Sequence, residues 1–463
     1  MKRTYGLLGW FLHYSFLSML GMLGISGYIL ADTFFVSLGL GADGLAALNL
    51  AIPIYSLIHG SGLLLGMGGA TKYSVYKSQG EREKANKVFF HGVFLSGCFA
   101  LIFVAAGCFL WRSITQWMGA DGAVFDMTGQ YLRVLLLFSP AFLLNDLLLC
   151  FVRNDGAPGL SMLAMIGGSL SNVALDYLFI FPMEMGIFGA VLATGLAPVI
   201  SMAVLSVHWR RKKNGFRLEK TKPSGRMTAS IFSLGFPSLV AQLSSGVVMV
   251  LFNQLILGLR GNLGVAAYGV VANLSLVAVA VFQGIEQGTQ PLLSRCYGKG
   301  DFIGIRRLLG YSMGTVLLLS FCLYAAIWGF SGPVAAAFNS QGNPALQQMA
   351  VEGLRLYFLA LPFVGINMIL SVLFTSTQSP GPAHWISLLR GLIVIVPMAL
   401  LLSRLWGMEG VWLSYPAAEG LVAGFGGWLY RGYRKKQLMM LKNHMGVEER
   451  LAEMKSKGER VSQ

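Results

Sequence analysis

The chain has 463 residues, of which 55% are hydrophobic and only 12% are charged, and its mean hydropathy is +0.63. A water-soluble protein carries about a quarter charged residues, so this composition excludes a soluble enzyme and predicts an all-α protein that crosses a bilayer many times. The formal net charge of +15 does not indicate a nucleic-acid partner, because the basic residues are concentrated in alternate loops.

Twelve apolar runs are bounded by charge, glycine or proline and suit a bilayer crossing. Their approximate ranges are 11–37, 46–70, 88–110, 127–152, 160–181, 187–208, 231–258, 264–290, 308–329, 348–375, 383–404 and 409–430. If the N-terminus is inside, the cytoplasmic loops hold most of the 35 Lys and Arg residues, which predicts that both termini are cytoplasmic. No cleavage site follows Met1, so we expect a first span and not a signal peptide.

The two halves of the chain repeat each other. Gly44-Leu45-Ala46-Ala47 returns as Gly264-Val265-Ala266-Ala267, 220 residues later, and the pair Gly186 and Gly189 returns as Gly407 and Gly410. Each half holds six spans, an even number, so the halves face the same way and are parallel repeats. The repeat predicts two pseudo-symmetric six-helix lobes.

The basic loop between the halves sets the expected domain boundaries. We expect an N-terminal lobe over 1–209, a basic cytoplasmic linker over 210–229 and a C-terminal lobe over 230–430. The remaining residues, 431–463, are expected to form a basic cytoplasmic tail, either helical or disordered, that lies against anionic lipid headgroups or serves only topology and solubility.

An acid within the first span is the main functional signal. Asp32 lies inside the membrane, where a charge costs about 2.5–3.5 kcal/mol, so it needs partners, water, a proton or a cation. Asn172 and Asp176 share one helix face in the fifth span, and Thr194 of the sixth span lies at the same depth. Such oxygens suit Na⁺, and two close carboxylates are also able to hold a proton. These four residues are therefore the predicted cation site, with a purely structural polar cluster as the alternative.

The second half lacks acids at the equivalent positions. Asp32 corresponds to Phe252, Asn172 falls near Ile393, and Asp176 falls near Pro397. A duplication that served stability alone does not require this asymmetry, so we expect the cation site to lie in the first lobe.

Further side chains predict a substrate cavity between the lobes. In the eighth span Gln283, Glu286 and Gln287 share a face, where Glu286 either attracts cationic substrates or pairs with Arg295 or Arg306. Flexible methionines and aromatic residues provide adaptable surfaces, and the aromatic candidates are Tyr28, Phe35, Tyr55, Phe252 and Phe282. Asp146 and Arg153, seven residues apart, are expected to form an ion pair at an inner helix end.

Several motifs together resemble the multidrug and toxic compound extrusion (MATE) family. They are Asp32-Thr33-Phe34-Phe35-Val36, Gly44-Leu45-Ala46-Ala47-Leu48, Phe151-Val152-Arg153-Asn154-Asp155-Gly156, Asn172-Val173-Ala174-Leu175-Asp176-Tyr177 and Gly186 to Thr194. The segment Gly284 to Pro291 is similar to the MepA-like bacterial branch. The resemblance implies a twelve-helix antiporter of the bacterial cytoplasmic (inner) membrane that exports bulky, often cationic drugs in exchange for Na⁺ or H⁺.

The resemblance also assigns the cation site to Asp32, Asn172, Asp176 and Thr194, the same four residues. Some family members carry an acid soon after the Gly-Phe-Pro entry of the seventh span, whereas here Gly235-Phe236-Pro237 is followed by Gln242, Ser244 and Ser245. This departure favours coupling through the first lobe alone.

Other classes of function fit less well. A flippase for lipid-linked precursors, which related folds perform, is the alternative, but it predicts a cationic cavity. The sequence has no GxxxxGK[ST] loop and no histidine pair on one helix, so we expect no enzyme activity and no cofactor besides the coupling ion. Drugs and membrane lipids are the expected partners of a monomer.

Overall fold

The computed structural model describes residues 6–212, 214–339 and 342–461, with side chains as far as residue 435. The first half consists of α1 (Leu7–Ser78), α2 (Arg82–Ala105), η1 (Ala106–Leu110), α3 (Trp111–Trp117), α4 (Gly122–Leu137), α5 (Ser139–Asn154), α6 (Pro158–Ile180), α7 (Gly186–Leu205) and α8 (Val207–Arg210). The second half consists of α9 (Gly225–Gly298), α10 (Phe302–Phe338), α11 (Pro344–Tyr357), η2 (Phe358–Ala360), α12 (Leu361–Ser376), α13 (Pro380–Leu388), η3 (Leu389–Ile393) and α14 (Ile395–Val461). Every regular element in these ranges is a helix.

The described helices make twelve membrane spans. Eight helical stretches are long and apolar enough to cross a bilayer, and the bent pair α4 and α5 adds a ninth. Three of the stretches cross twice, because a glycine with non-helical torsion angles divides each of them: Gly41 in α1, Gly261 in α9 and Gly407 in α14. The predicted all-α membrane class with twelve spans is confirmed.

The internal repeat is visible in the backbone itself. Gly41 has φ 67° and ψ −154°, and Gly261, 220 residues later, has φ 62° and ψ −156°. Gly186 and Gly407 likewise have φ values of 60° and 58°. A residue with a side chain rarely adopts a positive φ, so each half needs a glycine at the same break between two spans.

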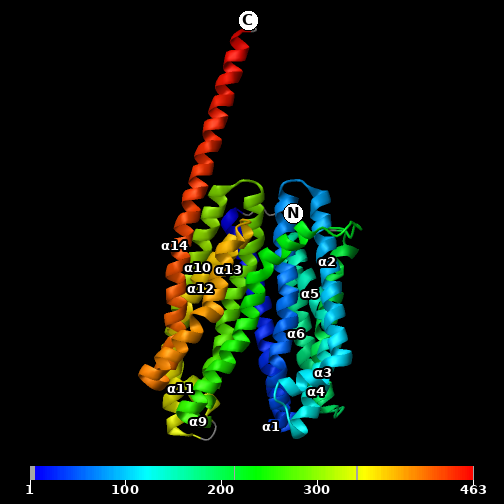
Figure 1. Ribbon diagram of the computed structural model, residues 1–463, viewed down its shortest axis with the longest axis vertical. Coiled ribbons are helices and arrows are strands. Elements are labelled where there is room, and N and C mark those ends of the chain that lie inside the picture. The colour runs from blue at the N-terminus through cyan, green and yellow to red at the C-terminus, as the bar shows by residue number, and fades with distance from the viewer. Residues whose placement is uncertain (1–5, 213, 340–341, 462–463) are drawn as a thin grey trace.

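The helices form two bundles that lie side by side (Figure 1). The N-terminal lobe holds α1 to α7 and the C-terminal lobe holds α9 to α14. In Figure 1 the lobes diverge away from the end at which α1 begins and from which α14 extends beyond the bundle. We call that end the basic end, because it includes Lys72, Lys77 and Arg210. The backbone of the predicted tail continues α14 as a helix to Val461, whereas residues 462–463 and the side chains of 436–461 lie outside the described part.

Glycines bring the two lobes into backbone contact near the basic end. A Cβ atom at Gly235 of α9 would strike the backbone of Leu64 in α1, and one at Gly68 would strike the backbone of Ile231. Gly284 and Gly288, in the second half of α9, similarly approach the backbone of the first half of α1. Small residues allow membrane helices to pack this closely, so these positions tolerate little addition of volume.

Polar contacts cross between the lobes at the same end. Gln290 of α9 donates a hydrogen bond to Thr71 at 2.7 Å and accepts one from Asn154 at 2.8 Å. The Lys72 ammonium group donates to Gln378, just beyond α12, at 2.8 Å. Gln290 is fully buried, so its bonds to Thr71 and Asn154 are made away from water and hold the lobes together there.

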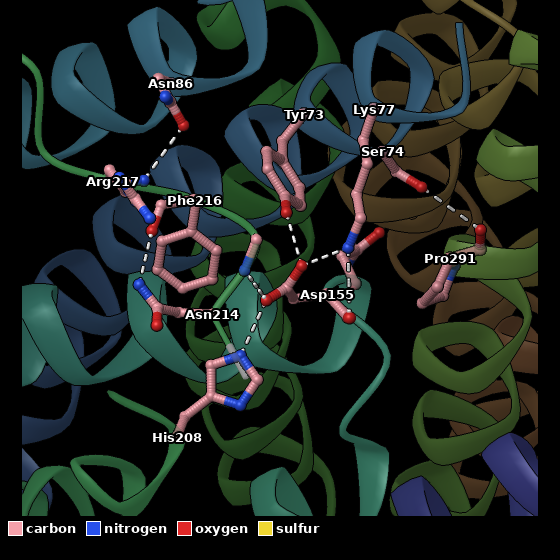
Figure 2. A network of polar contacts seen from close by, with 12 residues as sticks. Tyr73, Ser74, Lys77, Asn86, Asp155, His208, Asn214, Phe216, Arg217 and Pro291 are labelled. Carbon is pink, nitrogen blue, oxygen red and sulfur yellow. Dashed lines mark hydrogen bonds and ion pairs between the residues drawn. The ribbon is translucent and has the colours of Figure 1, made fainter. Parts of the chain in front are cut away.

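The linker between the lobes is anchored to the N-terminal lobe (Figure 2). Asp155 accepts hydrogen bonds from Tyr73 at 2.6 Å and from the Gly215 N–H at 2.6 Å, and it pairs with Lys77 and with His208. Phe216 of the linker is fully buried and packs between aromatic rings of α1, α2 and α5. These contacts hold the linker against the surface of the N-terminal lobe.

Candidate functional site

Three helices carry the four residues of the predicted cation site. Asp32 lies in α1, Asn172 and Asp176 lie in α6, and Thr194 lies in α7; all four are buried. Glycine again allows the close approach, because a Cβ at Gly39 of α1 would strike a side-chain carbon of Ile180 in α6. The folded chain therefore brings together residues that are up to 162 positions apart in sequence.

Side-chain and backbone hydrogen bonds connect the four residues into one cluster. The carboxyl groups of Asp32 and Asp176 lie within hydrogen-bonding reach of each other. With its amide oriented to satisfy both of its polar groups, Asn172 donates to Asp176 at 3.0 Å and accepts from the Thr194 N–H at 3.2 Å. The Thr194 hydroxyl donates to the Ala190 carbonyl at 3.1 Å. The cluster also includes a residue that the sequence did not predict, the buried Tyr131 of α4, whose hydroxyl group lies near Thr194.

The acids of this cluster have no basic partner in the described part of the chain. The ion pairs found there engage the buried or half-buried acids Glu81, Asp146, Asp155 and Glu419, but neither Asp32 nor Asp176. The Oδ1 atoms of Asp32 and Asp176 are also buried without a hydrogen-bond donor among the described residues. Two carboxylates so close repel each other unless a proton or a cation lies between them.

The aromatic candidates for the cavity separate into two groups. Tyr28 and Tyr55 are partly exposed, and their hydroxyl groups are hydrogen-bonded at 2.7 Å. Phe35 is also partly exposed and packs on Tyr177 and Phe181 of α6 and its C-terminal end.

The two candidates in the C-terminal lobe do not line an open space. Phe252 and Phe282 are both 0% exposed and belong to the hydrophobic core of that lobe. Phe252 packs against Tyr268 and Tyr357. Neither ring therefore lines a cavity in this structure. Sequence alone does not distinguish an aromatic residue that faces a neighbouring helix from one that faces a cavity.

The polar face of the eighth span points toward the other lobe. Gln283, Glu286 and Gln287 are partly exposed, and Gln287 accepts a hydrogen bond from the buried Arg153 of α5. The Glu286 carboxylate interacts electrostatically with Arg390 and Arg153. The expected pairing of Glu286 with Arg295 or Arg306 is not found among its described interactions. Its arginine neighbours are instead Arg390 of the C-terminal lobe and Arg153 of the N-terminal lobe.

Asp146 does not pair with Arg153 as expected. Its Oδ2 atom lies 2.7 Å from the Nδ1 atom of His59 in α1. The His59 ring stacks on Tyr55 at a centroid distance of 5.9 Å. The i to i+7 spacing suggested a pair on one helix, but the tertiary packing supplied a closer partner from a neighbouring helix.

The sequence reading also missed a charged cluster in the C-terminal lobe. Glu419 of α14 is 2% exposed and pairs with Arg390, whose Nη2 and Nε atoms lie 2.9 Å and 3.1 Å from Oε1. Asn367 of α12 donates to Glu419 Oε2 at 2.7 Å. The available signal was a charged residue in the middle of each of the last two apolar runs, Arg390 in one and Glu419 in the other. Neither residue lies at a position equivalent to a first-lobe acid, so the internal repeat does not point to this pair.

Comparison with known proteins identifies the family of this chain. The chain matches the MatE family over residues 18–178 and 237–401. It belongs to the MatE family. Members of this family are transporters and not enzymes, and they need no cofactor. The two matched segments fall in the two halves of the internal repeat, so this chain is a multi-pass MatE transporter with one copy of the repeat in each lobe.

The relatives of this MatE protein include exporters from staphylococci. The multidrug export protein MepA of Staphylococcus saprophyticus is 24% identical over 414 residues, which is 89% of this chain and 91% of the relative. MepA of Staphylococcus aureus is 24% identical over 416 residues, with the same two shares.

Solved structures share the fold of this MatE protein. A crystal structure of MATE in complex with MaL6 matches with a TM-score of 0.88 at 24% identity, over 94% of this chain and 97% of the other. An outward-facing conformation of a multidrug resistance MATE family transporter of the MOP superfamily matches with a TM-score of 0.87, at the same identity and coverage.

Proposed function

We propose that this protein exports drugs by cation-coupled antiport with alternating access. The substrates are bulky, often cationic organic compounds, and the coupling ion is Na⁺ or H⁺. The export of drugs is supported by the name of the staphylococcal relatives, which this chain covers almost completely. The site for the ion is Asp32, Asn172, Asp176 and Thr194.

The main support for a cation site is the environment of its two acids. Asp32 and Asp176 are buried, adjacent and without a basic partner in the described chain. An intramembrane carboxylate without a counter-ion is costly, so the site favours a proton shared between the acids or a small cation held by their oxygens. Asn172, Thr194 and Tyr131 supply further oxygens at the same place.

Alternating access follows from the arrangement of the lobes. In this structure the lobes are joined at the basic end, which supports a state that opens on the opposite side. The basic loops favour placing that end in the cytoplasm of a bacterium, with the protein in the cytoplasmic membrane and both termini inside. Coupling then requires that drug and cation differ in their affinity for the two states. A monomer suffices for this cycle, because both lobes belong to one chain.

The Asp32→Asn substitution tests the proposal. Asparagine keeps the shape of the side chain but removes the negative charge, so the variant should lose at least about tenfold of the gradient-driven drug efflux. We would measure efflux from proteoliposomes under separately imposed Na⁺ and pH gradients, which also identifies the ion. Size-exclusion chromatography in detergent should show that the variant remains folded.

Asp126→Asn is the matched control, because Asp126 lies in the neighbouring helix α4 but is exposed. It should transport as the natural protein does. Normal efflux by Asp32→Asn under both gradients would contradict the proposed cation site.

A further inference from the structure

The C-terminal lobe contains a buried acid whose charge is neutralised internally. Glu419 is 2% exposed, and its Oε1 atom accepts two hydrogen bonds from the Arg390 guanidinium group. Its Oε2 atom accepts a bond from Asn367, which is fully buried. Both oxygens of this acid therefore have donors, unlike the Oδ1 atoms of Asp32 and Asp176.

The internal repeat relates this cluster to the proposed cation site. The offset of 221 residues between Gly186 and Gly407 places Arg390 opposite Ser169 of α6 and Glu419 opposite Pro198 of α7. Ser169 is three positions before Asn172, and Pro198 is four positions after Thr194. The cluster thus occupies the same two spans of the other repeat, about one helical turn nearer the basic end.

The backbone around Arg390 departs from regular α-helix. Arg390 lies in η3, a π-helical turn over Leu389–Ile393, and such turns are often found at functional sites. The next residue, Gly391, packs so closely on Ser244 of α9 that a Cβ atom would strike that side chain. The extra residue in the turn and the small neighbour bring Arg390 to the position where it meets Glu419.

Arg390 is also connected to the interface between the lobes. Its guanidinium group interacts electrostatically with Glu286, which in turn interacts with Arg153 of the other lobe. The Arg390 side chain is 18% exposed, whereas that of Glu419 is 3% exposed. Charges of alternating sign thus run from the core of the C-terminal lobe to the interface.

We propose that the Arg390 guanidinium group is a built-in cation of the C-terminal lobe, and that its removal uncovers a second cation site made by Glu419 and Asn367. In the natural protein this lobe binds no exchangeable cation, because the positive charge that Glu419 requires is covalently attached. The inference deepens the proposed function, on which it rests, by assigning the coupling ion to the N-terminal lobe alone. The uncovered site takes a proton or a monovalent cation.

The test compares thermal unfolding of purified variants that all carry Asp32→Asn. Removing Asp32 excludes the first-lobe site from the comparison, so the result does not depend on whether that site couples transport. The first protein carries Asp32→Asn alone. The second combines Asp32→Asn with Arg390→Met, and the third adds Glu419→Gln to these two substitutions. A fourth variant combines Asp32→Asn with Arg355→Met, because Arg355 stacks on Trp328 and bonds Ser331 without a described carboxylate partner.

The expected result is a new cation dependence in one variant. The Tm of the Arg390→Met protein should be higher by about 2 °C or more in NaCl than in choline chloride at the same concentration, or should rise by that amount as the pH falls. The reason is that the Na⁺ ion or proton binds only the folded state. The Glu419→Gln and Arg355→Met proteins should show no such rise. A folded Arg390→Met protein whose Tm ignores both ions, or a rise that persists with Glu419→Gln, would overturn the proposal.

If the Arg390→Met protein folds poorly, a second measurement asks whether an added cation restores its folding. Sodium, mild acid or free guanidinium ion at millimolar concentration during purification should restore its folding, as each supplies the missing charge. If none of them does while the Glu419→Gln protein folds, the uncovered acid binds no cation and the inference is wrong. Failure of the proposed function is distinguished separately, by normal efflux from Asp32→Asn with Arg390 intact.

Discussion

The four acids that are buried in the described part of the chain differ in how their charge is balanced. Asp146 lies against His59, and Glu419 is bonded by Arg390 and Asn367. Asp32 and Asp176 have only each other and uncharged neighbours. Removing one partner of a buried ion pair is strongly destabilising, so the paired acids are bound to one arrangement, whereas the unpaired ones are able to exchange a proton or a cation.

Asp155 shows how much of the linker depends on one carboxylate. Burial opposes its charge, but hydrogen bonds from His208, the Gly215 N–H, Lys77 and Tyr73 outweigh burial and hold the pKa of Asp155 below its ordinary value. A group with a lowered folded pKa stabilises the fold above its unfolded pKa and loses that contribution as the pH falls through the folded value.

We therefore expect Asp155→Asn to destabilise the protein by about 1–3 kcal/mol at neutral pH, since the charge strengthens these bonds. The difference in Tm between the natural protein and the variant should be present above pH 5. It should shrink below about pH 4, near the pKa of an aspartate in an unfolded chain. The exposed Asp121 provides the control, as Asp121→Asn should leave Tm unchanged. An equal difference at pH 3 and pH 7 would refute this role of the charge.

At the scale of the helices, glycine decides how the spans turn and how closely they pack. Gly41, Gly261 and Gly407 end one span and begin the next with positive φ, while Gly68 and Gly235 bring α1 and α9 into backbone contact. The first group acts through torsion angles and the second through the missing Cβ atom. Only the second group is part of the contact between the lobes.

Gly235→Ala should open the basic end, because the added methyl group meets the backbone of Leu64, which is unable to move aside as a flexible side chain does. The change can be followed as an electron–electron spin distance between labels at Gln79 and Lys299, both exposed at this end, in a cysteine-free protein. We expect the population with the longer distance to increase. Gly246→Ala is the matched control in the same helix, since a Cβ there has nothing within 4 Å. Identical distances in both variants would mean that this contact does not set the state.

At the scale of the whole molecule, the lobes are two copies of one unit joined at one end. The polar contacts of Gln290, Lys72 and Arg153 cross between the lobes at the basic end, where Figure 1 also shows the lobes closest together. Each of these bonds is worth about 1 kcal/mol net. Together they bias an equilibrium between two states without making it irreversible.

Gln290→Leu should shift this equilibrium toward the state that is open at the basic end. It removes the bonds to Thr71 and Asn154, so the ratio of the two states should change by roughly five- to thirtyfold. The same pair of spin labels measures the populations, and drug efflux should slow. Gln347→Leu is the control, because the Gln347 amide bonds the Gly332 carbonyl within the C-terminal lobe. If the populations stay the same in Gln290→Leu, these bonds do not hold the closed end.

The number of spans, the repeat and the depth of the first-lobe acids could be predicted from sequence, because each depends on local features. Apolar run length, glycine spacing and position along a span follow directly from residue order, and the bilayer restricts the fold to helices that cross it. Asp32, Asn172, Asp176 and Thr194 were found by comparing such depths. In the structure these four residues lie together, with Thr194 joined to Asn172 through its backbone N–H.

Which side chain meets which other one was decided only by the tertiary structure. His59 rather than Arg153 pairs with Asp146, Tyr131 joins the acid cluster, Phe252 enters the core, and Arg390 neutralises Glu419. These contacts depend on the rotation of each helix about its axis and on the neighbour it packs against. In a nearly uniformly apolar span, little in the residue order indicates that rotation, because lipid and protein neighbours are similarly apolar.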